Sequence, residues 1–338
     1  MSADLQAIAE RIKKLRTRNR VLTCCLLVAV VVIGAVFWFL LAHTSADAGS
    51  TTTADAGSGV AADAGSAAAP PPRIEPGTHP ELDQALLDAT GEGHLEGVRS
   101  LLERGAYVDT RDDQLRTPLY LAAVKGNIEI CRLLVACGAE VSMRTKEGET
   151  LLGSAACCPS IDVPILLLDH GADPNARNTY LQTPLLFAAS AGRVDVARLL
   201  LTHGGDIWAR DYMGRTVLHY AAARGKDEFV KFLLDGGCGP NPKWAKNSPL
   251  REAAEEGHAE TARLLIAAGA DINARGADGE TALLRAAFRD RVEVVAVLLE
   301  HGADPNIRDD NGQTPLGRIW SDKQPEVAQI LRAHGATQ

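Results

Sequence analysis

The residues of this chain that could do chemistry, its histidines and carboxylates, recur at nearly fixed intervals. Four histidines share one place in the pattern, directly before a glycine: His170, His203, His301 and His334. Equivalent side chains on successive packed units should lie roughly 8 to 10 Å apart. A zinc ion needs its ligands at about 2.1 Å. We therefore predict that these histidines hold no metal, and we expect no cofactor.

The acidic residues follow the same interval. One carboxylate falls in the first turn of each predicted second helix: Glu96, Glu129, Asp162, Asp195, Glu228, Glu260, Glu293 and Glu326. A negative charge there stabilises the helix dipole, so these acids support helices and are not an acid/base pair. The chain has no Gly-x-x-x-x-Gly-Lys loop, His-Glu-x-x-His or Gly-x-Ser-x-Gly motif. We predict a protein that is not an enzyme and has no small-molecule substrate.

The interval itself belongs to a repeated helical unit. Each unit after the first begins with a short signal: a Thr or Ser, then Pro or another apolar residue, then Leu. The Thr or Ser lies at 117, 150, 183, 216, 248, 281 and 314, in steps of 33 or 32 residues. Thr caps a helix and Pro favours its first turn. Glycines at 105, 138, 171, 204, 237, 269, 302 and 335 end each unit and reveal an eighth at the front, roughly Gln84 to Asp109. The spacing predicts an all-α solenoid of about eight helix-turn-helix repeats.

The repeated residues carry a family resemblance. Thr-Pro-Leu-x-x-Ala-Ala, then Gly, then Glu-Ile-x-Arg-Leu-Leu, then Gly-Ala-Asp-x-Asn resembles the ankyrin repeat, over residues 78–338. The resemblance implies a curved ankyrin-repeat solenoid whose concave side, made of hairpin tips and first helices, binds another protein. It does not imply which protein.

The first 20 residues are basic and amphipathic. This segment has six basic and two acidic residues, and its apolar residues fall at a 3-4-3 spacing: Leu5, Ile8, Ile12 and Leu15. Two interpretations remain open: a helix that rests on anionic headgroups, or a short dimerisation seam of two heptads.

Residues 21–41 contain no charge, and this length is sufficient for a single transmembrane helix. Residues 42–77 contain Ala-Asp-Ala-Gly-Ser three times and then three prolines, so we predict a disordered linker. No cation follows the apolar span until Arg73. The positive-inside rule then places residues 1–20 in the cytoplasm, the anchor in the inner membrane and the repeats, 78–338, in the periplasm.

The few aromatic residues indicate a binding face. Within the ankyrin pattern the residue before each Ala pair faces the groove, and Phe187 and Tyr220 occupy this place in two units. Tyr180, Tyr212 and Trp244 fall at the expected hairpin tips above the same groove. We predict that these five bind the partner protein; the alternative is that some pack back onto the solenoid. Nearby acids, including Asp211 and Glu252, suggest a partner with a mixed apolar and basic surface.

Together these features predict a membrane-tethered module that binds a protein in the periplasm. The alternatives are a tethered structural spacer with no specific ligand and a cytosolic-facing ankyrin adaptor with inverted topology. A net charge of −8 argues against nucleic acid as a partner. In an oxidising compartment Cys131 or Cys137 could form a disulfide with Cys157 or Cys158; free buried thiols are the other possibility.

Overall fold

The computed structural model describes residues 77–243, 245–320 and 322–337, and this part of the chain contains sixteen helices and no strand. The helices follow one another in eight pairs, one pair per sequence unit. Their bounds are α2 (Pro80–Glu92), α3 (Leu95–Glu103), α4 (Pro118–Lys125), α5 (Ile128–Ala136), α6 (Leu151–Ala155), α7 (Asp162–Asp169), α8 (Pro184–Ala191), α9 (Val194–Thr202), α10 (Val217–Ala223), α11 (Asp227–Asp235), α12 (Pro249–Glu256), α13 (Ala259–Ala267), α14 (Ala282–Phe288), α15 (Val292–Glu300), α16 (Pro315–Arg318) and α17 (Pro325–Ala333). The predicted number of units is confirmed.

Most of the Thr and Ser signals start helices by the predicted mechanism; Thr183 is an exception, because its side chain caps no backbone N–H of α8. Thr117 has an extended backbone, and its side-chain oxygen accepts a hydrogen bond from the backbone N–H of Tyr120, three residues on. The same cap forms at Thr150, Ser248, Thr281 and Thr314. Each cap satisfies a donor that a helix start would otherwise leave unpaired.

Glycines end the helices in a left-handed conformation, as the sequence predicts. Gly126, which follows α4, has φ +74 and donates its backbone N–H to Ala123. In the seventh unit no glycine is available, and Asp290 adopts this conformation with φ +58. Aspartate tolerates it better than most residues because its short polar side chain can bond locally.

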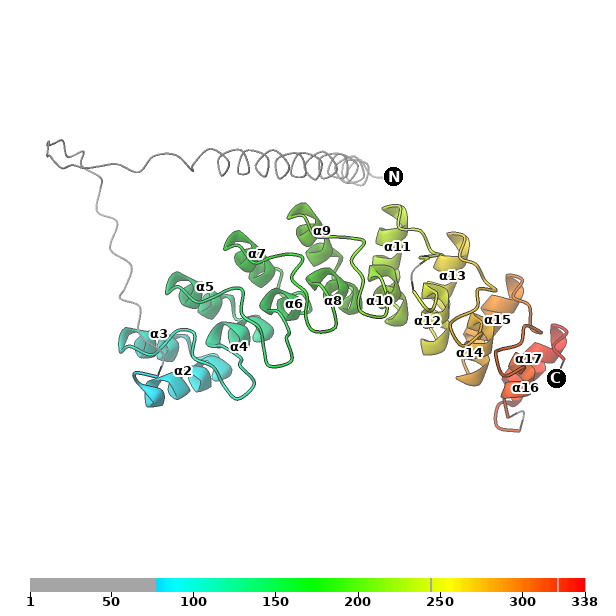
Figure 1. The fold of residues 1–338 in the computed structure, drawn as a ribbon, viewed down its shortest axis with the longest axis horizontal. Helices are drawn as coiled ribbons and strands as arrows, with labels where there is room; N and C mark the ends of the chain where they lie inside the picture. The colour runs from blue at the N-terminus through cyan, green and yellow to red at the C-terminus, as the bar shows by residue number, and fades with distance from the viewer. Residues whose placement is uncertain (1–76, 244, 321, 338) are drawn as a thin grey trace, which may run out of the picture. The chain divides into compact units, whose positions relative to one another are not determined.

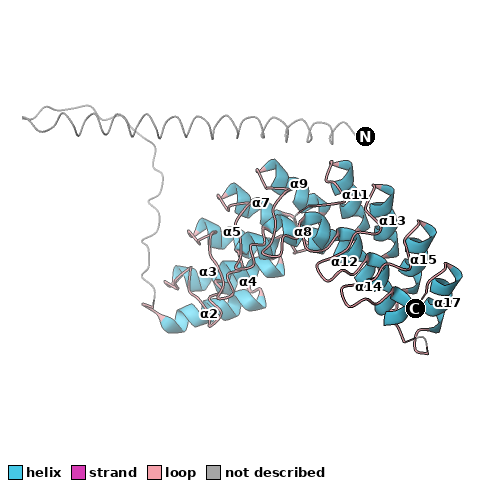
Figure 2. Ribbon diagram, turned by 45° about the vertical axis from the view of Figure 1, so that its right-hand side comes forward, coloured by secondary structure: helices cyan, strands magenta, loops and turns pink. Residues whose placement is uncertain are grey.

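The helices form two rows. Figures 1 and 2 show the first helices of the units, from α2 to α16, on the inner side of an arc, and the second helices, from α3 to α17, on its outer side. Alanine pairs make close packing of the first helices possible: Ala122 and Ala123 of α4 are fully buried, as are Ala188 and Ala189 of α8. The core therefore runs as a continuous layer along the solenoid, and each unit buries its neighbours.

Three units depart from the pattern. The first helix of the leading unit, α2, begins at Pro80, four residues before the predicted Gln84, because Pro80 fits the first helical position. The third unit has a helix of only five residues, α6, before Cys157. In the last unit α16 ends at Arg318, so Trp320 falls outside the helix.

The predicted N-terminal segments lie outside the described residues. This applies to the basic segment 1–20, the span 21–41 and all but the last residue of the linker 42–77. None of the helices in the described ranges has the length and hydrophobicity that crossing a bilayer requires.

Candidate partner-binding surface

The inner row of helices presents one residue per unit toward the groove. In the second to the eighth unit these residues directly precede the Ala pair, or Ile319-Trp320 in the eighth: Leu121, Ser154, Phe187, Tyr220, Glu252, Arg285 and Arg318. All seven are half-buried. The row is apolar or aromatic for most of its first four positions and charged in its last three, so the inner face has two chemically different halves.

Two exposed tyrosines meet at the tips of adjacent loops. Tyr180 precedes α8 and Tyr212 precedes α10, with 56% and 62% of their surfaces exposed. Their ring centroids lie 5.9 Å apart, and the backbone N–H of Tyr212 donates to the carbonyl of Tyr180 at 3.1 Å. The backbone bond fixes the two tips relative to each other. The pair is therefore a preorganised aromatic surface of the kind that binds partner side chains.

Phe187 and Tyr220 lie deeper than the tip tyrosines. The ring of Phe187 lies against Gly153 of the preceding unit, where a Cβ atom would meet ring carbons at 3.4 Å. The Tyr220 hydroxyl accepts a hydrogen bond from Gln182 at 2.6 Å and donates one to Asp211 at 2.9 Å. Burial raises the pKa of Tyr220 above its ordinary value. Tyr220 thus holds neighbouring units together as well as lining the groove.

Trp244, the fifth predicted contact residue, lies outside the described residues. Asp211, the acid next to Tyr212 in the sequence, is buried and forms an ion pair with Arg215 at 2.8 Å. It therefore does not offer a free charge to a partner, although the sequence suggested that it would.

Two leucines at loop tips were missed by the sequence reasoning. Leu115 and Leu181 are each about two-fifths exposed and have φ of +58 and +59. Four other units have glycine at the same place, two residues before the capping residue: Gly148, Gly214, Gly279 and Gly312. The signal was present, since leucine is a poor residue for a left-handed position. Leu181 adjoins Tyr180 and extends the apolar tip.

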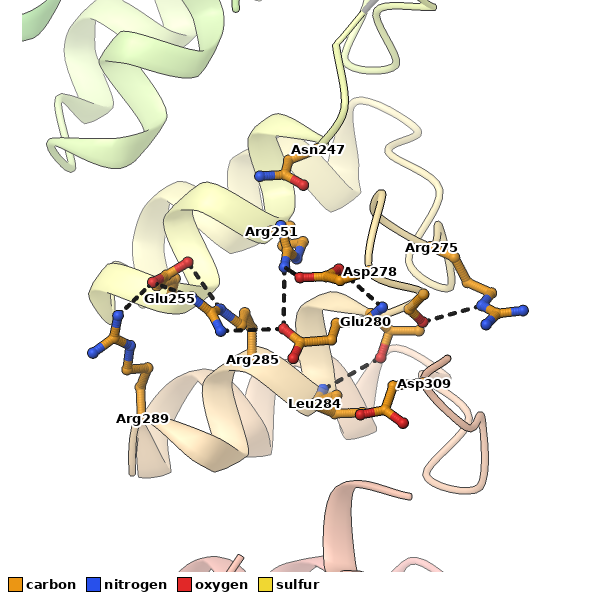
Figure 3. A network of polar contacts seen from close by, with 12 residues as sticks. Asn247, Arg251, Glu255, Arg275, Asp278, Glu280, Leu284, Arg285, Arg289 and Asp309 are labelled. Carbon is orange, nitrogen blue, oxygen red and sulfur yellow. Dashed lines mark hydrogen bonds and ion pairs between the residues drawn. The ribbon is translucent and has the colours of Figure 1, made fainter. Parts of the chain in front are cut away.

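The charged half of the groove is an arginine–carboxylate network. Figure 3 shows Arg251, Glu255, Glu280, Arg285 and Arg289 of this network, and Arg318 joins it through Glu280. Glu280 is buried and pairs with three arginines from three successive first helices: Arg251 of α12 at 3.1 Å, Arg285 of α14 at 3.2 Å and Arg318 of α16 at 2.8 Å. The network joins the sixth, seventh and eighth units along their inner side.

Glu255 is the second anion of this network. Arg285 lies 2.6 Å and Arg289 2.7 Å from its carboxylate, and Figure 3 shows Glu255 between them. Hydrogen bonding by Arg285, aided by Arg289, lowers the pKa of Glu255 to about 2. The carboxylates of Glu255 and Glu280 are therefore both paired with arginines of the solenoid. They stabilise the fold and offer no unpaired charge to a partner.

A hollow of about 450 Å³ opens beside this network. Its walls come from three consecutive units: Met213 and Arg215 from the fifth, Lys246, Asn247, Arg251, Glu252 and Glu255 from the sixth, and Ala277, Asp278 and Arg285 from the seventh. Met213, which lines the hollow, directly follows the tip residue Tyr212 in the chain.

Two further exposed aromatic residues lie near the C-terminal end. Trp320 is 70% exposed, whereas the equivalent Ala123, Ala189 and Ala287 of other units are fully buried. An indole does not fit where only alanine fits, so α16 stops early and Trp320 turns outward. Lys323 lies 4.6 Å from its ring centroid, and Arg318 lies 5.1 Å from that of Phe288. Substitution of the alanine pair by Ile319 and Trp320 was the signal in the sequence.

The described histidines and cysteines do not form a reactive site. The imidazole Nδ1 atoms of His170, His203, His301 and His334 each lie within 2.9 Å of the carbonyl four residues earlier. No group of three or more metal-binding side chains occurs in the described ranges. Among the described cysteines all five are free, and burial raises the pKa of Cys131 to about 12, so the reactive thiolate is disfavoured.

Eight stacked helix pairs, most of them with a capped start and a glycine at a helix end, define a helical repeat solenoid. A family model described as ankyrin repeats (3 copies) matches residues 86–178, 137–211, 166–244, 211–276 and 250–338. The chain belongs to the ankyrin repeat family. A comparison with curated proteins found no match.

Proposed function

We propose that this protein is a membrane-tethered interaction module that binds a partner protein through the inner face of its ankyrin solenoid. Ankyrin repeats generally mediate protein–protein interaction and are typically not enzymes. The observation that carries the proposal is the pair formed by Tyr180 and Tyr212, two exposed aromatic residues held 5.9 Å apart at adjacent loop tips. Leu181, Phe187 and Tyr220 extend this surface into the groove, and Trp244 follows in the next unit.

The site is tested by removing the exposed tyrosines. Tyr180→Ala with Tyr212→Ala should weaken partner binding by at least about 2 kcal/mol, since exposed aromatic anchors dominate interfaces. Helicity and melting temperature should change little, because neither side chain is buried. Partners captured by the full-length protein are identified by mass spectrometry, and their affinities for wild type and variant are then compared.

Tyr220 supplies a matched control. Tyr220→Phe removes the hydroxyl that Gln182 and Asp211 share, and it should lower stability more than the exposed double variant does. Wild-type affinity in the double variant would reject this surface. If neither the wild-type protein nor any variant captures a partner, the alternative of a structural spacer is favoured.

The location is part of the same proposal. Six basic residues precede the apolar stretch 21–41, and none follows it before Arg73. By the positive-inside rule the repeats reside in the periplasm and residues 1–20 in the cytoplasm. A C-terminal alkaline phosphatase fusion, which requires periplasmic oxidation, should be active. If a reporter that is active only in the cytoplasm, fused to the same terminus, gives a stronger signal than alkaline phosphatase, the cytosolic-facing adaptor is supported instead.

A further inference from the structure

The hollow between the fifth and seventh units has a chemical preference that its charges define. Three of its four cations are already held by carboxylates: Arg215 by Asp211, Arg251 by Asp278 and Glu280, and Arg285 by Glu255 and Glu280. The fourth, Lys246, is exposed, so water solvates its charge. These four cations therefore do not require an anionic group from a partner.

The three carboxylates that line the hollow differ in how they are paired with cations. Glu255 pairs with Arg285 and Arg289, and Asp278 pairs with Arg251. Glu252 is half-buried and, within the described ranges, receives only the Asn247 side-chain amide, at 3.2 Å, with no cation in ion-pair contact. Arg215 interacts electrostatically with Glu252, but its guanidinium forms its ion pair with Asp211. Desolvation of a charge without an ion-pair partner of its own is unfavourable. Glu252 is therefore the group in the hollow that gains most from an added cation.

The surroundings of Glu252 suit a cation on an apolar stem. Met213 and Ala277 provide apolar wall, and the exposed ring of Tyr212 stands beside Met213 in the chain. Aromatic faces attract guanidinium and ammonium groups. Residues 78–338 contain 28 Lys and Arg against 37 Asp and Glu, a net charge of −9. A field of this sign steers basic partners toward the solenoid.

We propose that the partner places a lysine or arginine side chain in this hollow, with its stem against Met213 and Ala277 and its charge at Glu252. This inference rests on the proposed function, because it names the chemistry that the same inner face recognises. A volume of about 450 Å³ is within the range of pockets that hold compact ligands. The tip tyrosines then supply apolar contact, and Glu252 supplies the preference for a basic residue.

The probe is a phage library of random nine-residue peptides selected on the full-length protein. Enriched peptides should share a lysine or arginine flanked by apolar residues. Synthetic copies should bind Glu252→Gln at least about tenfold more weakly than wild type, the lower end for a close charge pair. Glutamine keeps the acceptor for Asn247, so the fold is retained, and circular dichroism verifies this.

Two matched changes isolate the contact. Glu256→Gln alters an exposed acid on the same helix outside the hollow and should leave affinity unchanged. Replacing the basic residue of the peptide by glutamine should weaken binding to wild type but cause little further loss in Glu252→Gln. Glu252→Arg should in turn favour a peptide in which glutamate replaces the basic residue.

The outcomes separate this inference from the function on which it rests. Peptides that lose affinity for the Tyr180/Tyr212 double variant but bind Glu252→Gln like wild type leave the surface in place and overturn the basic-residue contact. Enriched peptides without a shared basic residue overturn it as well. Indifference to both variants, or no enrichment at all, counts against both proposals.

Discussion

At the scale of single residues, His219 shows how a repeat position acquires a structural role. The backbone N–H of Thr216 donates to its Nδ1 atom at 3.1 Å, so Nε2 carries the hydrogen and donates to the carbonyl of Asn247 at 2.9 Å. The imidazole thus joins the fifth unit to the sixth. Because it is buried, its pKa is lowered to about 4.

Acid should weaken the fold through this residue. An unfolded histidine has a pKa of about 6.5, so between roughly pH 6.5 and 4 the unfolded chain binds a proton that the folded chain refuses. Stability that is fully present above pH 6.5 is lost as the pH falls, by about 2 to 3 kcal/mol down to pH 4.5. Urea unfolding of wild type and His219→Gln at both ends of this range measures it. The variant starts less stable and should show a flatter pH dependence; equal slopes would contradict the assignment.

At the scale of elements, the loop tips combine backbone strain with exposed apolar side chains. Leu181 occupies a left-handed position where Gly148, Gly214 and Gly279 stand in other units. That conformation costs an L residue about 1 kcal/mol or more. Leu181 is about two-fifths exposed and makes its tip apolar beside Tyr180. Under the proposed function, this strained apolar tip contacts the partner.

Leu181→Asn should therefore separate stability from binding. Asparagine tolerates the left-handed conformation, so the free energy of unfolding should stay level or rise by up to about 1 kcal/mol. Affinity for the partner should fall, because an apolar contact is lost. Chemical unfolding and binding are measured on the same sample. The reverse control is Gly148→Ala, whose Cβ would lie 2.5 Å from a methyl carbon of Thr179 and should destabilise the chain. A lower stability for Leu181→Asn would contradict the strain.

Local signals made most of these elements predictable. Thr117 caps its helix by bonding a backbone N–H three residues away, and Gly126 ends the helix through its own backbone. Both effects can be predicted from the local sequence. The exposed tips Tyr180 and Tyr212 followed from the period in the same way. The exact start of α2 did not, because Pro80 replaces the repeated Thr-Pro signal.

Contacts between units were harder to predict. Tyr220 appeared to be a free groove residue, but it bonds Gln182, which is 38 positions earlier in the chain. Arg285 and Arg318 occupy the same repeat position as Tyr220, and both form ion pairs with Glu280. Such partnerships depend on how one unit is rotated against the next, and a 33-residue period does not specify that rotation. The hollow next to Glu252 escaped prediction for the same reason.

At the scale of the whole molecule, each unit contacts mainly its neighbours, so stability in a solenoid is a sum of unit and junction contributions. The arginine–carboxylate network places most of the described ion pairs between units in the last three units. Glu280 is its centre, because three arginines from α12, α14 and α16 meet on this one buried carboxylate. The C-terminal unit also has the shortest first helix, and so it depends strongly on this junction.

Glu280→Gln should loosen the C-terminal part of the solenoid and leave the rest unchanged. Glu280→Gln removes one of the two carboxylates that each of the three arginines contacts, and Asp278, Glu255 and Asp309 remain. The cost should therefore fall below the about 3 to 5 kcal/mol of a buried charge left without any partner. Hydrogen exchange should accelerate in α14 to α17, while α4 to α9 keep their protection, since the array transmits a loss only through successive junctions. Glu256→Gln, an exposed acid on α12, controls for the charge change and should leave both regions protected. Faster exchange along the entire array would mean that the solenoid unfolds as one cooperative body and that the network is not a local junction.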